Sequence, residues 1–275
     1  MACNDTTLGL CGGTPGTAFP TGDGSLARRT RNARPYRAKK IIRKKERILI
    51  SERLWDILVT SFPKILLPGL TMTIPLTAIS FTLALVIAIF TAMIQLARIP
   101  VLRQLARFYI WVVRGTPLLV QLYVVFYGLP NLGIMIDPFP SAVLVFSINE
   151  GAYCAETMRA ALESVPLEQI ESGLCLGMSW LKTMWHVVLP QALRTAFPPL
   201  SNSLIGMVKD TSLAANITVM EMFMVTQRIA SRHYEHLALY IEVALIYLLF
   251  CTVLTKVQAR VEKRLSRFQC REENA

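Results

Sequence analysis

The sequence predicts an all-α integral membrane protein with about five transmembrane helices. The 275-residue chain is 53% hydrophobic with a mean hydropathy of +0.44, which is too apolar for an ordinary soluble domain. Several stretches also reach the roughly 20 apolar residues needed to cross a bilayer. The basic residues behind the net charge of +11 cluster near the chain ends and in short loops. That distribution is typical of membrane flanks and not of a nucleic-acid-binding face.

The N-terminal part is expected to lie outside the bilayer core. Residues 1–47 are rich first in Gly, Thr and Pro and then in Lys and Arg, which predicts a disordered basic arm without the apolar region of a secretory signal. Residues 48–63 place Leu54, Ile57, Leu58 and Phe62 at helical spacing. They are therefore expected to form an amphipathic helix at the membrane surface.

Five stretches are expected to cross the membrane: residues 65–96, 108–129, 141–162, 184–208 and 237–254. The loop between the last two is polar, with a short amphipathic helix in its middle, and residues 266–275 form a polar C-terminal tail. The positive-inside rule places the basic C-terminal flank in the cytoplasm, and parity then places the Arg98/Arg103 loop and the Glu171 loop there too. The basic N-terminal arm would lie outside. Either the arm is translocated, or the native chain starts further along.

The three middle spans are interrupted. Pro117 lacks an N–H and follows Gly115, so the second span should be disturbed there. In the third span Asn149 and Glu156 share a face, and Glu156 can pair with Arg159 one turn away. Polar groups of this kind can simply join helices. Three adjacent interrupted spans, however, are typical of transporters, and their ionisable residues favour a solute path.

The sequence contains no GxxxxGK[ST], GxSxG or HExxH motif, so a phosphate loop and two common hydrolase sites are excluded. The six cysteines show no metal-ligand or disulfide spacing. His233 and His236 could share a metal, but without further ligands they are expected to be ordinary solvated side chains. A membrane enzyme, the alternative class, would need a cluster of reactive side chains that the sequence does not show. The sequence therefore predicts a solute pathway in a chain that has no ATPase site of its own.

The stretch "ESGLCLGMSWLKTMWHVVLP", residues 171–190, resembles the EAA loop of ATP-binding-cassette (ABC) transporter permeases. "ARFYIWVVRGTPLLVQLYVVFYGLP", "GAYCAETMRAAL" and "LPQALRTAFPPLSNSLIGMVKDTSLA" resemble the polar amino-acid permease family, and within it the L-cystine branch. The resemblance covers about residues 54–265. It implies a type I-like permease domain over residues 64–265, with a cytoplasmic coupling loop at about 166–182. Val187 takes the position of an isoleucine in that motif, and the implied ATPase-coupling residues are Glu171, Ser172, Gly173, Gly177, Leu189 and Pro190.

The resemblance also implies partners and a substrate class. The expected partners are an ABC ATPase subunit, which uses ATP and Mg, an extracytoplasmic amino-acid-binding protein, a second permease copy or paralogue, and membrane lipid. The chain itself is expected to bind no cofactor and no nucleic acid and to be a multi-pass protein of a bacterial cytoplasmic membrane. L-cystine is the first expectation for the solute, with glutamine, glutamate, histidine or arginine as alternatives.

A zwitterionic solute needs acids for its ammonium group and a cation or free N–H groups for its carboxylate. On this basis the candidates for the solute path are Arg114, Tyr127, Glu150, Glu156, Asp210, Thr211 and Ser212.

Overall fold

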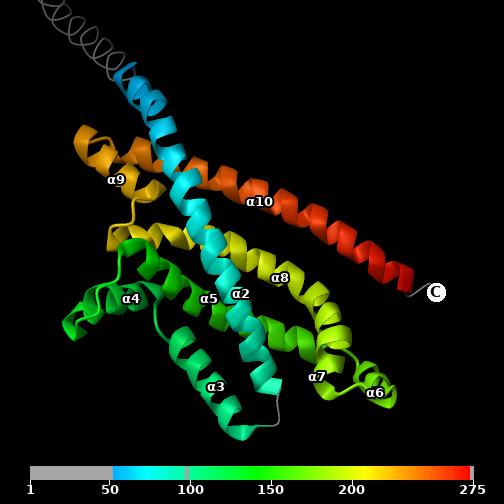
Figure 1. Cartoon of the computed structure of the whole chain (residues 1–275). Coiled ribbons are helices and arrows are strands. Elements are labelled where there is room, and N and C mark those ends of the chain that lie inside the picture. Colours follow the sequence, from blue (N-terminus) through cyan, green and yellow to red (C-terminus); the bar gives the residue numbers. More distant parts are fainter. Residues whose placement is uncertain (1–51, 97–98, 273–275) are drawn as a thin grey trace, which may run out of the picture. The chain divides into compact units, whose positions relative to one another are not determined.

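The computed structural model describes residues 52–96 and 99–272, with side chains up to residue 264. The chain divides into two units, Met1–Arg53 and Leu54–Ala275, and the second forms the helical bundle in Figure 1. Within the described ranges the secondary structure is helical, with no strand. The expected disordered arm lies outside the described residues.

The bundle begins with a helix that runs from Glu52 to Leu96. It contains a wide π-turn, η1 (Gly69–Thr73), followed by α2 (Ile74–Leu96). The described part of the expected surface helix, residues 52–63, is helical and continues into the first span without a break. Residue 63 is therefore not the end of a helix, and residues 48–51 lie outside the described ranges.

The second expected span, residues 108–129, is not a single straight helix. It is replaced by α3 (Pro100–Gly115), an extended link at Thr116 and Pro117, α4 (Leu118–Tyr123), a π-turn η2 (Val124–Gly128) and a 3-10 turn η3 (Leu129–Leu132). The two arms are bent by 101°. Arg103, expected in a loop, lies on α3 because Pro100 starts that helix earlier.

The bundle is centred on α5 (Pro138–Glu163), which packs along α2 and against α8 (Leu189–Asp210) (Figure 1). Small residues allow this close approach. A Cβ on Gly151 would lie 2.9 Å from the Ile87 side chain. The core around these helices is likewise rich in buried alanine, with Ala88, Ala92, Ala152, Ala155 and Ala192.

The segment between α5 and α8 consists of α6 (Leu167–Cys175), α7 (Trp180–Thr183) and a π-turn η4 (Met184–Val188). After α8 the chain forms a 3-10 turn η5 (Thr211–Ile217), α9 (Met222–His233) and α10 (His236–Glu272). The short helix expected in the loop between the last two spans is α9. Helix α10 packs on α8 and α9 and continues into the expected C-terminal tail.

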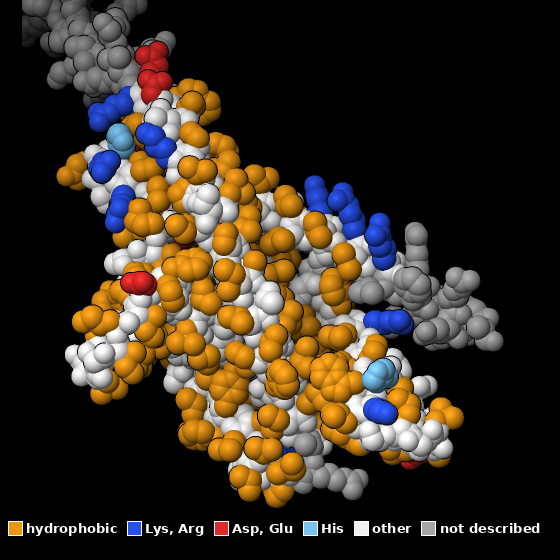
Figure 2. All heavy atoms as spheres, viewed as in Figure 1, with side chains coloured by type: hydrophobic (Ala, Val, Ile, Leu, Met, Phe, Trp, Pro, Cys, Tyr) orange, Lys and Arg blue, Asp and Glu red, His pale blue; other side chains and the backbone are white. Residues whose placement is uncertain are grey.

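Two helices of the described residues are long and apolar enough to cross a membrane, Glu52–Leu96 and His236–Arg264, each with a mean hydropathy of 2.3. The bent pair Pro100–Gly115 and Leu118–Leu132 makes a third if it is one broken span and not a re-entrant loop. Hydrophobic side chains cover much of the face in Figure 2, and Lys and Arg gather towards its ends. At 26 and 22 residues, α5 and α8 reach about 39 and 33 Å. Their polar residues keep them below the hydropathy of a simple span, so the count of five stays a prediction.

Candidate solute path and coupling segment

The bend between α3 and α4 is held by the side chain of Gln121. Pro117 cannot offer an N–H to Val113, the residue four positions earlier, and the Gln121 Nε2 donates to the Val113 carbonyl at 2.8 Å instead. The same amide donates to the Thr116 carbonyl at 3.1 Å and hydroxyl at 2.8 Å. Its Oε1 accepts from Asn149 Nδ2 on α5 at 3.1 Å. The Gln121 side chain thus provides hydrogen bonds to two carbonyls of the bend and joins the bend to α5, and partners of this kind are what irregular backbone needs within a membrane.

Arg114 and Glu156, two candidates for the solute path, meet beside this bend. The Arg114 guanidinium lies 3.8 Å from the Glu156 carboxylate and 5.1 Å from the centre of the Tyr153 ring. Glu156 also pairs with Arg159 at 3.4 Å, which confirms the pair expected from helical spacing. Arg159 makes shorter bonds of 2.7 and 2.8 Å to Glu163. A network of alternating charges therefore follows one face of α5.

Glu150 lies six residues before Glu156 on α5 and is half-buried where α5 packs against α8. It accepts a hydrogen bond from the Cys154 thiol at 3.5 Å. Its carboxylate also interacts with the Ser203 side chain and feels the negative charge of Asp210. The structure thus brings Glu150 and Asp210 into one electrostatic neighbourhood, separate from the Arg114–Glu156 pair.

The remaining path candidates have mostly local partners. The Tyr127 hydroxyl donates to the Asn216 carbonyl at 3.1 Å, which joins η2 to η5. The buried Thr211 hydroxyl donates to the Val208 carbonyl at 2.7 Å, and Ser212 donates to the Lys209 carbonyl at 2.8 Å. The seven candidates therefore do not form one cluster.

The expected coupling loop folds as two short helices joined by a turn at Gly177. Helix α6 ends at Cys175, and Gly177 has a φ of +78°, a conformation that favours glycine. The Gly177 N–H donates to the Leu174 carbonyl at 2.9 Å, and the Met178 N–H donates to the Gly173 carbonyl at 3.1 Å. These two bonds form a Schellman cap. Ser179 then caps α7 by accepting from the Lys182 N–H.

Gly173 and Leu189, two of the implied coupling residues, are buried inside this chain. A Cβ on Gly173 would lie 2.7 Å from Thr183 Cγ2 and 3.0 Å from its Oγ1, so glycine allows α6 to pack against α7. Leu189 is buried in the core, while Pro190 at the start of α8 is exposed. The resemblance implies a coupling role for Gly173, and in the structure this residue contacts the chain itself.

The outer side of the segment combines an acid with bare apolar side chains. Glu171 and Ser172 are exposed, and the Ser172 hydroxyl is bonded to the Glu168 carbonyl at 2.6 Å. Leu176 is 82% exposed, and its apolar neighbours that are also exposed are Leu174, Trp180, Leu181 and Trp185. Exposed apolar residues gathered in this way mark an interaction surface.

Glu221 is a buried residue that the sequence did not single out. Its carboxylate caps α9 by accepting from the Met224 N–H at 2.8 Å, and it accepts from the Tyr247 hydroxyl on α10 at 2.8 Å. Burial raises the pKa of this carboxyl, against the smaller opposing effect of these hydrogen bonds. The signal available in the sequence was a glutamate just before a helical stretch.

No group of three or more potential metal ligands occurs in the described residues. His233 is exposed at the end of α9. Cys154 is buried, as expected for a small apolar side chain, and Cys154, Cys175 and Cys251 are free thiols.

Apolar helices that bend at satisfied breaks, with ionisable groups between them, define a membrane protein with a polar interior. The chain belongs to the family of binding-protein-dependent transport system inner membrane components, whose family model matches residues 84–267. This result confirms the resemblance found in the sequence and identifies a membrane subunit of a transport system.

Relatives and solved structures agree with this assignment. The chain is 46% identical to the L-cystine transport system permease protein TcyB of Bacillus subtilis, over 78% of this chain and 92% of TcyB. It is 40% identical to the glutamine transport system permease protein GlnP of Escherichia coli, over 57% of this chain and 73% of GlnP. The crystal structure of an amino acid ABC transporter with histidines is similar to this chain, with a TM-score of 0.69 and 32% sequence identity. The match covers 75% of this chain and 96% of the transporter chain. The MetNI methionine ABC transporter shares the fold, with a TM-score of 0.59 and 15% identity over 72% of this chain and 93% of its own.

Proposed function

We propose that the chain is the permease subunit of an ABC importer that carries a polar amino acid, L-cystine in the first place, across the cytoplasmic membrane of a bacterium. The observation that carries this proposal is the 46% identity with the L-cystine permease TcyB over most of both chains. The likeness to the amino acid ABC transporter crystallised with histidines supports the wider substrate class. Glutamine, glutamate, histidine and arginine are the alternative solutes.

The segment between α5 and α8, here called the coupling segment, favours an interaction with a separate ATPase subunit. Its exposed apolar side chains and Glu171 lie on α6, α7, η4 and the turn between the two helices. In this proposal an ABC ATPase that uses ATP and Mg packs against this surface, and Gly177 fixes the turn presented to it. An extracytoplasmic amino-acid-binding protein delivers the solute on the opposite side, and a second permease copy or paralogue completes the membrane part.

The charged groups between the helices support passage of a zwitterion. Arg114 on α3 offers a cation to the solute's carboxylate, while Glu156 and Glu150 on α5 offer acids to its ammonium group. Because each of these groups already has a partner in this chain, a passing solute would exchange one charged contact for another. Such exchange keeps binding weak enough for release.

The proposal is tested by uptake of labelled L-cystine into cells that lack their own cystine uptake. The cells express this chain together with an ABC ATPase and an amino-acid-binding protein from the same genome. Unlabelled glutamine, glutamate, histidine and arginine serve as competitors. The variant Glu171→Lys, which reverses the exposed charge of the coupling segment, should remain in the membrane and lose uptake. A matched control is Arg232→Gln, which changes an exposed charge on α9 and should transport normally.

Uptake of cystine that only unlabelled cystine suppresses would support the first choice of solute. Stronger suppression by one of the other four amino acids would make that amino acid the preferred solute, and the chain would still be an amino-acid permease. No ATP-dependent uptake of any of the five, with the chain present in the membrane, would refute the proposed function.

A further inference from the structure

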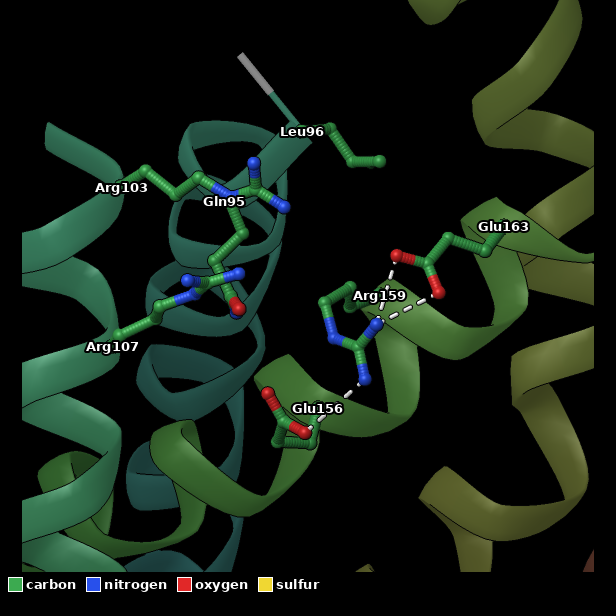
Figure 3. Close-up of a pocket in the computed structure, with 7 residues that line it drawn as sticks. All are labelled: Gln95, Leu96, Arg103, Arg107, Glu156, Arg159 and Glu163. Atoms are coloured by element: carbon green, nitrogen blue, oxygen red, sulfur yellow. Dashed lines mark hydrogen bonds and ion pairs between the residues drawn. The ribbon is translucent and has the colours of Figure 1, made fainter. Parts of the chain in front are cut away.

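A charged cleft lies where α2 ends, α3 begins and α5 ends. It has a volume of about 420 Å³ and is lined by Gln95 and Leu96 of α2, Arg103 and Arg107 of α3, and Glu156, Arg159 and Glu163 of α5. Figure 3 shows the side chains of all three helices converging on this space. Its size lies within the range of about 300–1,000 Å³ that is usual for small-molecule sites.

The charges that line the cleft leave two guanidinium groups available. Arg159 is occupied by Glu156 at 3.4 Å and Glu163 at 2.7 Å. Arg103 and Arg107 lie one turn apart on α3, and in the part of the chain that the structure describes neither has an acid within ion-pairing distance. With three arginines and two glutamates, the cleft carries a net positive charge. It is therefore suited to an anion.

Gln95 supplies a further donor to the cleft. The residue is 7% exposed, and among the described residues its buried Nε2 has no hydrogen-bond partner. Figure 3 shows the Gln95 side chain on the same side of the cleft as those of Arg103 and Arg107. A buried amide donor left unpaired is costly, and an oxyanion held by the two guanidinium groups would satisfy it. Two cations and an amide N–H form a donor set that matches a carboxylate.

The position of the arginines on α3 favours a dissolved ligand over a lipid. Arg103, Arg107 and Arg114 follow one stripe of the helix, since they are separated by about one and two turns. The exposed apolar residues Val101, Leu105, Phe108 and Val112 follow the opposite stripe, which suits contact with lipid. The cleft therefore faces the helices α2 and α5, on the same side as the Arg114–Glu156 pair.

We propose that this cleft is the exit site of the solute path, in which Arg103, Arg107 and Gln95 bind the carboxylate of the transported amino acid before its release into the cytoplasm. The inference rests on the proposed function. The arginine stripe gives the carboxylate successive partners, from Arg114 beside the bend to Arg107 and Arg103 at the cleft. The cleft lies at the end of α5 that leads into α6, so it opens on the side of the coupling segment.

The experiment measures protection of individual arginines from phenylglyoxal. The full chain is reconstituted in nanodiscs of phosphatidylcholine, without ATPase or ATP, and modification is followed by peptide mass spectrometry. The probe is the one of the five amino acids that uptake identifies, compared with its decarboxylated amine, for example L-cystine with cystamine or L-glutamine with 4-aminobutanamide. We expect the amino acid that uptake identifies to slow modification of Arg103 and Arg107, while its amine leaves both unchanged. Arg232 on α9 is the internal control, since it should react equally in all samples.

Variants test the donor set. Gln95→Leu should weaken the protection of both arginines about tenfold, and Arg107→Gln should weaken that of Arg103 about ten- to hundredfold, because hydrogen bonds to charged groups are lost. Absence of protection by the amino acid that uptake identifies would overturn the proposal, even where uptake succeeds. In nanodiscs that also contain phosphatidylglycerol, protection of both arginines without amino acid, and no further effect of adding it, would overturn the proposal by identifying a lipid headgroup as the ligand. Failure of uptake is measured separately and would refute the proposed function instead.

Discussion

The contact between Gly173 and Thr183 gives a prediction whose sign can be worked out from the structure. Gly173→Ala gains helix propensity of about 1 kcal/mol in α6. Its new Cβ would, however, lie 2.7 Å from Thr183 Cγ2, and overpacking of this kind costs typically about 1–3 kcal/mol. Thr183 is buried and its hydroxyl donates to the Ser179 carbonyl at 3.2 Å, so it cannot turn away freely. We expect a net destabilisation of about 1 kcal/mol.

Removing the opposing side chain should reverse this sign. In a Thr183→Ala background the Cγ2 and Oγ1 atoms are gone, and Gly173→Ala should then stabilise α6 by about 1 kcal/mol through propensity alone. The four proteins of this double-mutant cycle are compared by hydrogen exchange of peptides that cover α6 and α7, with a peptide from α9 as the control. A change of 1 kcal/mol alters the local opening equilibrium about fivefold.

The cycle would refute the reasoning in either of two ways. Gly173→Ala alone could increase the protection of α6, which would mean that the tight contact is relieved at little cost. The two substitutions could also be additive, which would mean that the two residues do not share a packing constraint. Faster exchange in Gly173→Ala together with slower exchange in the double variant, relative to Thr183→Ala, is the expected result.

Three further predictions concern other residues. Gly177→Asn should retain the ATPase in pull-downs, because Asn tolerates a positive φ, whereas Gly177→Leu should insert normally but lose the ATPase; equal retention by both would contradict a role in docking. Glu156→Gln should lower uptake without lowering the amount of permease bound to ATPase, and unchanged uptake kinetics would reduce Glu156 to a link between helices. Because burial raises the pKa of Glu221, its contribution to stability is full below the ordinary carboxyl pKa and is lost as pH rises through the raised value. Thermal unfolding in detergent should therefore depend less on pH in Glu221→Gln than in the parent protein, and identical pH dependence would disprove this.

Features fixed by neighbouring residues were predictable from the sequence. The Glu156–Arg159 pair follows from helical spacing, and the break at Pro117 follows from its missing N–H. The direction of that break, a bend of 101°, depends on contacts between α4 and its neighbours, which no local pattern encodes. The same is true of the bond between Gln121 and Asn149, whose residues are 28 positions apart.

The surroundings of the charged residues near the helix ends could not be predicted from the sequence. Arg103 is expected in a loop because the expected second span begins at residue 108. The cleft that it lines exists only because the ends of α2, α3 and α5 meet. Likewise, the resemblance implies coupling roles for Ser172 and Gly173, but only the structure shows that Gly173 packs against Thr183 while Ser172 is exposed. Sequence patterns thus identified the classes of residue, and tertiary contacts assigned their partners.

The side-chain amide of Gln121 carries the same donor and acceptor pair as a peptide group, so at the bend it takes the place of a backbone hydrogen-bond partner. In hydrocarbon, each unsatisfied peptide carbonyl costs several kcal/mol, and moving α4 away from α3 would remove the Gln121 bonds to the Val113 and Thr116 carbonyls. The bond between Gln121 and Asn149 joins α5 to the same bend. The link between α3 and α4 is consequently expected to resist flexing, although its backbone is extended.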